Sequence, residues 1–217
     1  MLYNTPIYEV LDFCHTALVN AQEIPQIQEA LARLNYTPEK FMEGMNLYHA
    51  AQGAVAVRQT RLAEQMGKTE ALKEVAKTAR KGYMRHLKLA RIAFQEDVEA
   101  RIALGLDGTR ADGLADWQKQ ANQFYANLQS TPAYRAALLP YNLTSAEITH
   151  GLAQLAAVQT AYLARETARG LALQATLDRD HALKVLKAWV SDMLTIARLA
   201  LEDHPQRLEA LGLTIPS

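Results

Sequence analysis

The feature that most constrains the fold is a long internal repeat at a spacing of 107 residues. Residues 35–60 return, with substitutions, as residues 142–167. Aligned without a gap from Ile7 to Leu106, the two halves share 23 identical residues, where chance gives about 6 to 8 for such a composition. The identities include two capping threonines, one proline and one terminal glycine, which fall at the same places in both halves: Thr37/Thr144, Thr69/Thr176, Pro25/Pro132 and Gly105/Gly212. The sequence therefore predicts that one helical unit was duplicated and fused.

The repeat predicts how the chain divides. We place the first helical repeat at residues 1–106 and the second at 107–217, with a linker rich in glycine and aspartate at 106–113. The period is far longer than that of the common helical solenoids. Two similar halves of one chain commonly relate by a pseudo-twofold axis, as in a symmetric dimer. We expect the two repeats to pack as one compact unit with that symmetry.

Helix-forming residues dominate, and the alternation typical of β-strands is scarce. In the first repeat, a helix follows Thr5-Pro6, and Pro25 interrupts it before a short second piece. A long helix is predicted over 38–66 and another over 69–104, ended by Gly67 and Gly105. Because only two residues separate them, these helices should form an antiparallel hairpin. The prediction is an all-α bundle of three long helices plus a short one in each repeat.

Composition and charge limit the function classes. The chain has 23 basic and 23 acidic residues, which argues against a protein whose whole surface binds nucleic acid. A single cysteine, Cys14, excludes an intramolecular disulfide and a cysteine-rich metal cage. No apolar run approaches the roughly 20 residues of a membrane helix, and the N-terminus lacks the pattern of a secretory signal. We expect a soluble, cytoplasmic protein with no membrane partner.

Small residues occupy one face of the helix predicted over 38–66, and they recur in the second half: Gly44, Ala50 and Ala54, with their counterparts Gly151, Ala157 and Ala161. Such a face allows another backbone to approach closely, so we predict a tight helix–helix seam there. Arg58 and Arg165 lie beside the seam in the two halves. A structural ion pair is one interpretation, with the acids present in both halves as candidate partners: Glu9/Asp116 and Glu96/Asp203. The other interpretation is a ligand-binding pocket between the repeats, lined by Arg58, Arg165 and His49.

Glu147-x-x-His150 is the spacing found in carboxylate-bridged di-metal bundles. Such a site needs a second copy of the motif, and the equivalent positions in the first half are Lys40 and Glu43. Thr144 and Glu147 also form a capping box, which gives this glutamate a structural role. The chain is therefore predicted to bind no metal ion and no cofactor.

No motif of nucleophilic catalysis is present. Cys14 and His15 are adjacent, so on a helix their side chains point about 100° apart and do not pair. Cys14 falls on an apolar stripe and is predicted to be a core residue. The chain also lacks a P-loop, a G-x-G-x-x-G and a G-x-S-x-G motif.

One stretch departs from the even charge balance. Between Glu74 and Glu96 six basic residues occur without an acid, within about 140° of a helical wheel. They are Lys77, Arg80, Lys81, Arg85, Lys88 and Arg91. This stripe is either a docking surface for an acidic protein, a phosphorylated ligand or nucleic acid, or a solvated face paired with neighbouring acids. Only Tyr83 could stack on bases there, so nucleic acid is not the expected partner.

From these residues we predict a non-enzymatic helical bundle that acts through protein–protein contact, including self-association. The alternative is a ligand-binding or enzymatic bundle with the arginine-lined pocket between its repeats.

Overall fold

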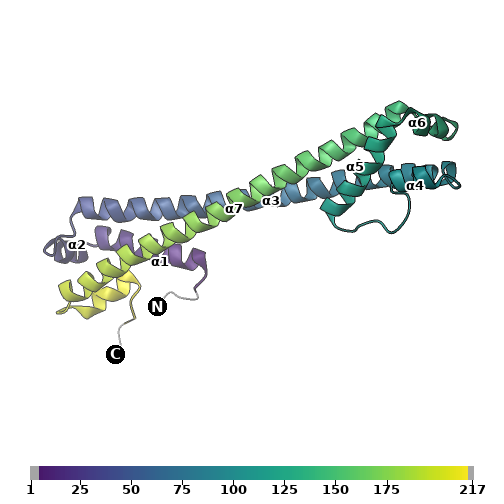
Figure 1. Cartoon of the computed structure of the whole chain (residues 1–217). Helices are drawn as coiled ribbons and strands as arrows, with labels where there is room; N and C mark the ends of the chain where they lie inside the picture. The colour runs from purple at the N-terminus through teal and green to yellow at the C-terminus, as the bar shows by residue number, and fades with distance from the viewer. Residues whose placement is uncertain (1–4, 215–217) are drawn as a thin grey trace. The chain divides into compact units, whose positions relative to one another are not determined.

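A computed structural model describes residues 5–214, and these form helices and connecting segments without a β-strand (Figure 1). The all-α prediction is thereby confirmed, and long helices pack against one another. In chain order the elements are α1 (Ile7–Glu23), α2 (Pro25–Ala32), α3 (Pro38–Ala93), α4 (Val98–Ala103), α5 (Leu114–Ser130), α6 (Pro132–Leu138), the 3-10 helix η1 (Leu139–Tyr141), α7 (Ser145–Ala200) and the 3-10 helix η2 (Pro205–Leu211).

The predicted hairpin at Gly67 is wrong, because α3 runs through it as one helix of 56 residues. Gly67 does not adopt a positive φ, so it supplies no left-handed stop. The Thr69 hydroxyl, expected to cap a new helix, donates to the Gln65 carbonyl one turn earlier at 2.8 Å. A glycine inside a helix costs only about 1 kcal/mol, which packing elsewhere along α3 outweighs.

The helix predicted over 69–104 is also wrong at its C-terminal end, because α3 ends at Ala93 and a separate short helix, α4, precedes Gly105. Pro25 and Pro205 each begin a new element, and Gly105 and Gly212 have φ of 57° and 78° after α4 and η2. Two asparagines also adopt positive φ, Asn35 at 68° and Asn142 at 56°. The bounds of α5 and α7 lie 107 positions after those of α1 and α3 at both ends.

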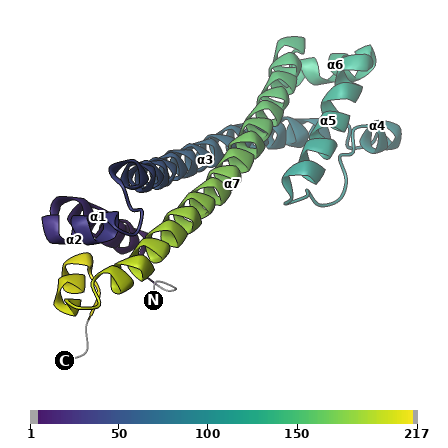
Figure 2. The same cartoon turned by 90° about the vertical axis from the view of Figure 1, so that its left-hand side faces the viewer.

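The described chain divides into two compact units. The first comprises Met1–Ala63 and Gly170–Ser217, and the second comprises Glu64–Arg169. Each unit therefore takes one part of α3 and one part of α7, together with shorter helices from both halves of the sequence. Within the first unit, α1 and α2 lie beside the C-terminal part of α7 (Figures 1 and 2).

The core of the first unit is built by α1, α2, α3, α7 and η2. Trp189 of α7 lies edge-on to Phe41 of α3, with ring centroids 6.5 Å apart. Gly44 is buried where Leu18 and Trp189 press against α3, so the predicted close approach of helices occurs there. The Asn20 amide donates to the Ala210 carbonyl of η2 at 2.6 Å, which joins the first half of the chain to the second.

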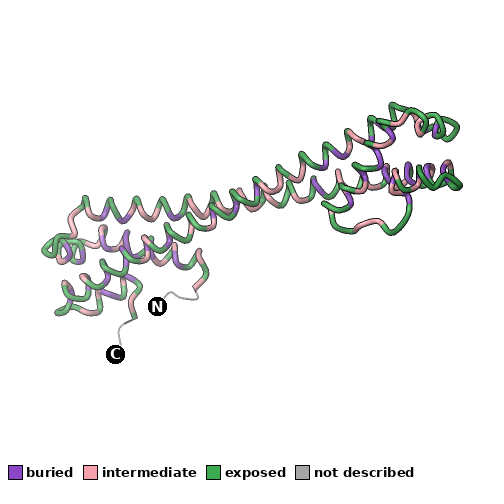
Figure 3. Tube along the Cα trace, in the orientation of Figure 1, coloured by how far each residue is buried: buried purple, intermediate pink, exposed green. Residues whose placement is uncertain are grey.

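The core of the second unit is richer in aromatic rings. Tyr83 of α3 packs edge-on against Trp117 and Phe124 of α5 at 6.3 and 5.6 Å between centroids. Asn127, which is 107 positions after Asn20, donates to the Ala103 carbonyl of α4 at 2.5 Å. Figure 3 shows how buried positions recur along the helices.

The predicted small-residue seam is only partly present. Gly151 is buried against Tyr125, as Gly44 is against Leu18 and Trp189. Ala50 and Ala157, by contrast, are exposed, so that part of the prediction is wrong. Ala54 and Ala161 are half-buried, and Ala161 packs against the core of the second unit.

Candidate functional site

The three residues predicted to line a ligand pocket belong to different units, His49 and Arg58 to the first and Arg165 to the second. Arg165 pairs with its neighbour Glu166, in place of the acids that the sequence suggested, and lies 5.2 Å over the Tyr162 ring. Arg58 is half-buried and makes no hydrogen bond or ion pair with the described residues. His49 is exposed. No hydrogen bond, ion pair or ring contact joins these three side chains to one another, and the pocket stays a prediction.

Two members of the basic stripe fasten the segment predicted to be a linker. Arg80 donates to the Asp112 carbonyl at 2.6 Å, and its guanidinium lies 5.0 Å above the Trp117 ring. Arg91 donates through Nε to the Leu106 carbonyl at 2.7 Å. Both guanidinium groups are therefore occupied by backbone carbonyls of the loop between α4 and α5, and they are structural.

Arg110, within this loop, was missed by the sequence argument. Its guanidinium donates to the Gly105 carbonyl at 2.9 Å and to the Tyr83 hydroxyl at 3.0 Å. It also reaches the Asp107 carbonyl at 2.5 Å. A lone arginine in a glycine- and aspartate-rich segment was the available signal, since such carbonyls need donors.

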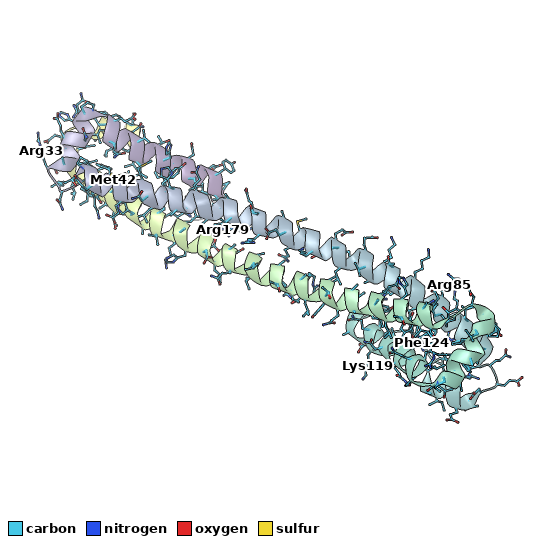
Figure 4. All side chains as sticks on the ribbon, turned by 90° about the horizontal axis from the view of Figure 1, so that it is seen from above. Arg33, Met42, Arg85, Lys119, Phe124 and Arg179 are labelled. Atoms are coloured by element: carbon cyan, nitrogen blue, oxygen red, sulfur yellow. The ribbon has the colours of Figure 1, made fainter. Side chains whose placement is uncertain are left out.

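The remaining basic residues of the stripe are exposed on α3. Lys77 forms an exposed pair with Glu74 at 3.7 Å. Lys81, Arg85 and Lys88 make no ion pair with any described residue (Arg85 is labelled in Figure 4). Their spacing of four and then three residues aligns them on one side of the helix. The stripe is thus reduced to three free cations on a single face.

Three large apolar side chains extend this face. Ile92 follows Lys88 by four residues and is 57% exposed, while Val98 and Ile102 on one side of α4 are 66% and 70% exposed. Ile92 and Val98 line an open hollow of about 770 Å³ at the turn between α3 and α4, together with Ala93, Gln95 and two acids, Glu96 and Asp97. We name the combined surface the basic–apolar face; it consists of Lys81, Arg85, Lys88, Ile92, Val98 and Ile102.

A buried polar cluster lies on the inner side of the same part of α3. His86 is only 5% exposed, and its Nδ1 lies 3.0 Å from the Tyr125 hydroxyl. Its Nε2 lies 3.6 Å from the Glu147 carboxylate at the start of α7. The sequence suggested a pairing of Glu147 with His150, but the His150 side chain contacts Gln154 instead. Counterparts of His86 and Tyr125 in the other unit are core residues, Met193 and Leu18.

Burial determines the protonation of this cluster. It raises the pKa of the Tyr125 hydroxyl, so the group stays a neutral phenol. It also lowers the pKa of His86, against the opposing effect of the Glu147 carboxylate. Neutral His86 can accept from the Tyr125 hydroxyl and donate to Glu147, whereas protonation would remove the acceptor from a buried phenol.

Lowering the pH below about 6.5 is expected to weaken the second unit. The pKa of His86 is lower in the folded chain than in the unfolded one, so the unfolded state binds more protons in this range. The free energy of unfolding should therefore fall as pH decreases from about 6.5 toward the lowered pKa, by at most about 1.4 kcal/mol per pH unit. The double variant His86→Met/Tyr125→Phe, which leaves no unpaired hydroxyl, should lose less stability than wild type.

Urea unfolding at pH 7.5 and pH 5.5 measures this difference, since the two proteins differ only at positions 86 and 125. An equal loss in wild type and the double variant would contradict the role assigned to His86.

The described residues offer little for nucleophilic or metal chemistry. Burial raises the pKa of the Cys14 thiol to about 11, so it is protonated at neutral pH and inert. Among residues 5–214, no group of three or more histidine, cysteine, aspartate or glutamate side chains is arranged to hold a metal ion. Over the same range, no helix has both the length and the apolar character needed to cross a lipid bilayer.

The strongest candidate site is thus the basic–apolar face, three unpaired cations beside three exposed apolar side chains in the second unit. Comparison of the chain with protein-family models, with curated proteins and with solved structures finds no match.

Proposed function

We propose that this protein is a non-enzymatic helical protein that acts by binding another protein through the basic–apolar face of its second unit. The observation that carries the proposal is the exposure of Ile92, Val98 and Ile102, at 57–70%, next to unpaired cations. Scattered apolar residues are normal on protein surfaces, but a cluster beside a hollow is typical of interaction sites.

The chemistry of this face indicates the chemistry of its partner. Lys81, Arg85 and Lys88 favour an acidic segment and would speed its association. Ile92 and Ile102 would provide the apolar contact that holds the segment once it is bound. The fitting partner is an acidic protein segment that presents apolar side chains on the same side.

Self-association through this face is a special case of the proposal. The first unit contains 12 acidic and 9 basic residues, whereas the second contains 11 acidic and 14 basic ones. The position that corresponds to Arg85 is Asp192 in the first unit. A second copy could therefore offer complementary charge.

We also propose that the chain consists of two homologous repeats, 1–106 and 107–217, related by pseudo-twofold symmetry. The support is the shift of 107 positions that relates α1 to α5 and α3 to α7. Asn20 donates to Ala210 and Asn127 donates to Ala103. The two donors are 107 positions apart, as are the two acceptors, and each bond joins one half of the chain to the other. In this proposal each unit is assembled from both repeats, as the units of a domain-swapped dimer are.

Site-specific photocrosslinking tests the proposed contact. A photoreactive amino acid at Ile102, in the full chain expressed in its own cells, should form an adduct with one discrete protein. The same amino acid at Glu209, the counterpart in the first unit, is the matched control and should not form it. The adduct should disappear when Lys81→Glu and Arg85→Glu are added, because the partner's acids then meet like charge.

The mass of the adduct identifies the kind of partner. An adduct of twice the chain mass would show self-association, and one containing nucleic acid would contradict the protein–protein proposal. Identical adducts from Ile102 and Glu209, or none from Ile102, would also contradict it.

A further inference from the structure

The second unit has a groove on another surface, between α5 and α7. Its volume is about 630 Å³, within the range of about 300–1,000 Å³ of small-molecule sites. Leu152 and Leu155 of α7 form an apolar part of its lining, with the rest of the wall formed by Ala115, Gln118, Lys119, Asn122, Ala156 and Gln159. The groove therefore combines aliphatic surface with side-chain amides and one ammonium group.

The corresponding place in the first unit is occupied by the protein's own rings. The positions 107 residues before Asn122 and Leu155 are His15 and Tyr48. These rings stack between α1 and α3, with centroids 4.8 Å apart and an interplanar angle of 32°. If the two proposed repeats are equivalent, the first unit has a pair of planar rings at this position, with His15 exposed, whereas the second unit has an amide and a leucine there.

We propose that the open groove of the second unit binds a small aromatic carboxylate. A planar ring fits because the equivalent position of the first unit holds planar rings between the same two kinds of helix. Leu152, which is half-buried, provides apolar surface on which a ring packs, while Leu155 lines the groove with only 4% of its surface exposed. The amides of Asn122 and Gln159 can bond to polar substituents of the ring.

The proposed ligand carries a carboxylate because Lys119 places a positive charge at the groove. Its ammonium group is exposed on α5 and makes no ion pair with any described residue (Figure 4). No acid lines the groove, so an anion meets no like charge there. A carboxylate on the ring would pair with Lys119 while the ring packs on the leucines. This site goes beyond the proposed function, since it shares no residue with the basic–apolar face.

Saturation-transfer NMR on the full chain, with 4-hydroxyphenylacetate as the probe, tests the proposal. The probe should show saturable binding to wild type, and the neutral analogue 4-methylphenol should bind about fivefold more weakly. Lys119→Gln should weaken binding of the anionic probe by about fivefold and leave that of 4-methylphenol unchanged. The graft Asn122→His/Leu155→Tyr brings in the ring pair of the first unit and should abolish binding of both probes.

The graft is the decisive variant because it fills the groove, and circular dichroism checks that it keeps the helical fold. As a second variant, Gln159→Glu introduces a like charge and should weaken only the anionic probe. Absence of saturable binding to wild type would overturn the proposal. Binding that persists in the folded graft would overturn it too, by placing the probe elsewhere.

Discussion

Gly151→Ala is expected to lower the free energy of unfolding by about 2 kcal/mol, although alanine is the better helix former. A Cβ atom at this position would lie 2.5 Å from Cε1 and 2.7 Å from the hydroxyl of the Tyr125 ring. The ring is 1% exposed and held by Tyr83, Phe124 and His86, so it cannot move aside without disturbing the core. Overpacking typically costs about 1–3 kcal/mol; because this ring is held on several sides, we expect about 3 kcal/mol, which less a helix gain of about 1 kcal/mol leaves about 2 kcal/mol.

Gly67→Ala is the matched control in the other long helix. A Cβ atom at Gly67 would meet nothing within 4 Å, so only the helix propensity changes. This variant should be more stable than wild type by about 0.5–1 kcal/mol. Urea unfolding monitored by far-ultraviolet circular dichroism gives the sign of the change in the free energy of unfolding for each variant. If Gly67→Ala lowered the stability, Gly67 would have to adopt the left-handed conformation that the sequence predicted. If Gly151→Ala left the stability unchanged, the close packing of Gly151 on Tyr125 would be contradicted.

Cutting the chain in the loop between α4 and α5 is expected to leave the two halves bound to each other. A protease site inserted between Gly108 and Thr109, which are exposed, would divide the protein close to the boundary of the two proposed repeats. The core of the first unit takes Phe41 from one half and Trp189 from the other. The second unit likewise joins Tyr83 to Phe124. Separating the halves would expose both cores to water, so association should withstand the cut.

Size-exclusion chromatography with light scattering measures the outcome. The cut protein should elute at the mass of the intact chain, while a denaturing gel shows two fragments. A separated half would have its core residues exposed to water and should not stay folded. Fragments that elute separately and remain helical would therefore contradict the finding that each core is built from both halves. The uncut protein with the inserted site is the control for effects of the insertion itself.

Residues that constrain the backbone over a few positions predicted several helix starts and ends correctly. Pro25 and Pro132 begin α2 and α6, and Gly105 and Gly212 adopt positive φ. The capping role assigned to Thr144 is also observed, since its hydroxyl accepts from the Glu147 amide at 3.4 Å. These signals act through local sterics and hydrogen bonds, so they can be recognised without knowledge of the partners in space.

Gly67 and the basic stripe were misjudged for the opposite reason. Gly67 can end a helix or continue it, and the difference of about 1 kcal/mol is decided by the packing of α3 elsewhere. Similarly, the sequence placed Arg80 and Lys81 on one charged face. Only the folded loop shows that Arg80 binds the Asp112 carbonyl while Lys81 remains exposed. The pairing of His86 with Glu147 joins residues from α3 and α7 that no local pattern connects.

By itself, then, the sequence determined that the chain is helical and where several of its helices begin, at residues such as Pro25 and Pro132. Tertiary structure decided which charges remain free, which glycines must stay small, and which halves combine to form each core. The division has a physical cause: backbone preference is set by neighbouring residues, whereas burial and charge pairing depend on residues distant in the chain.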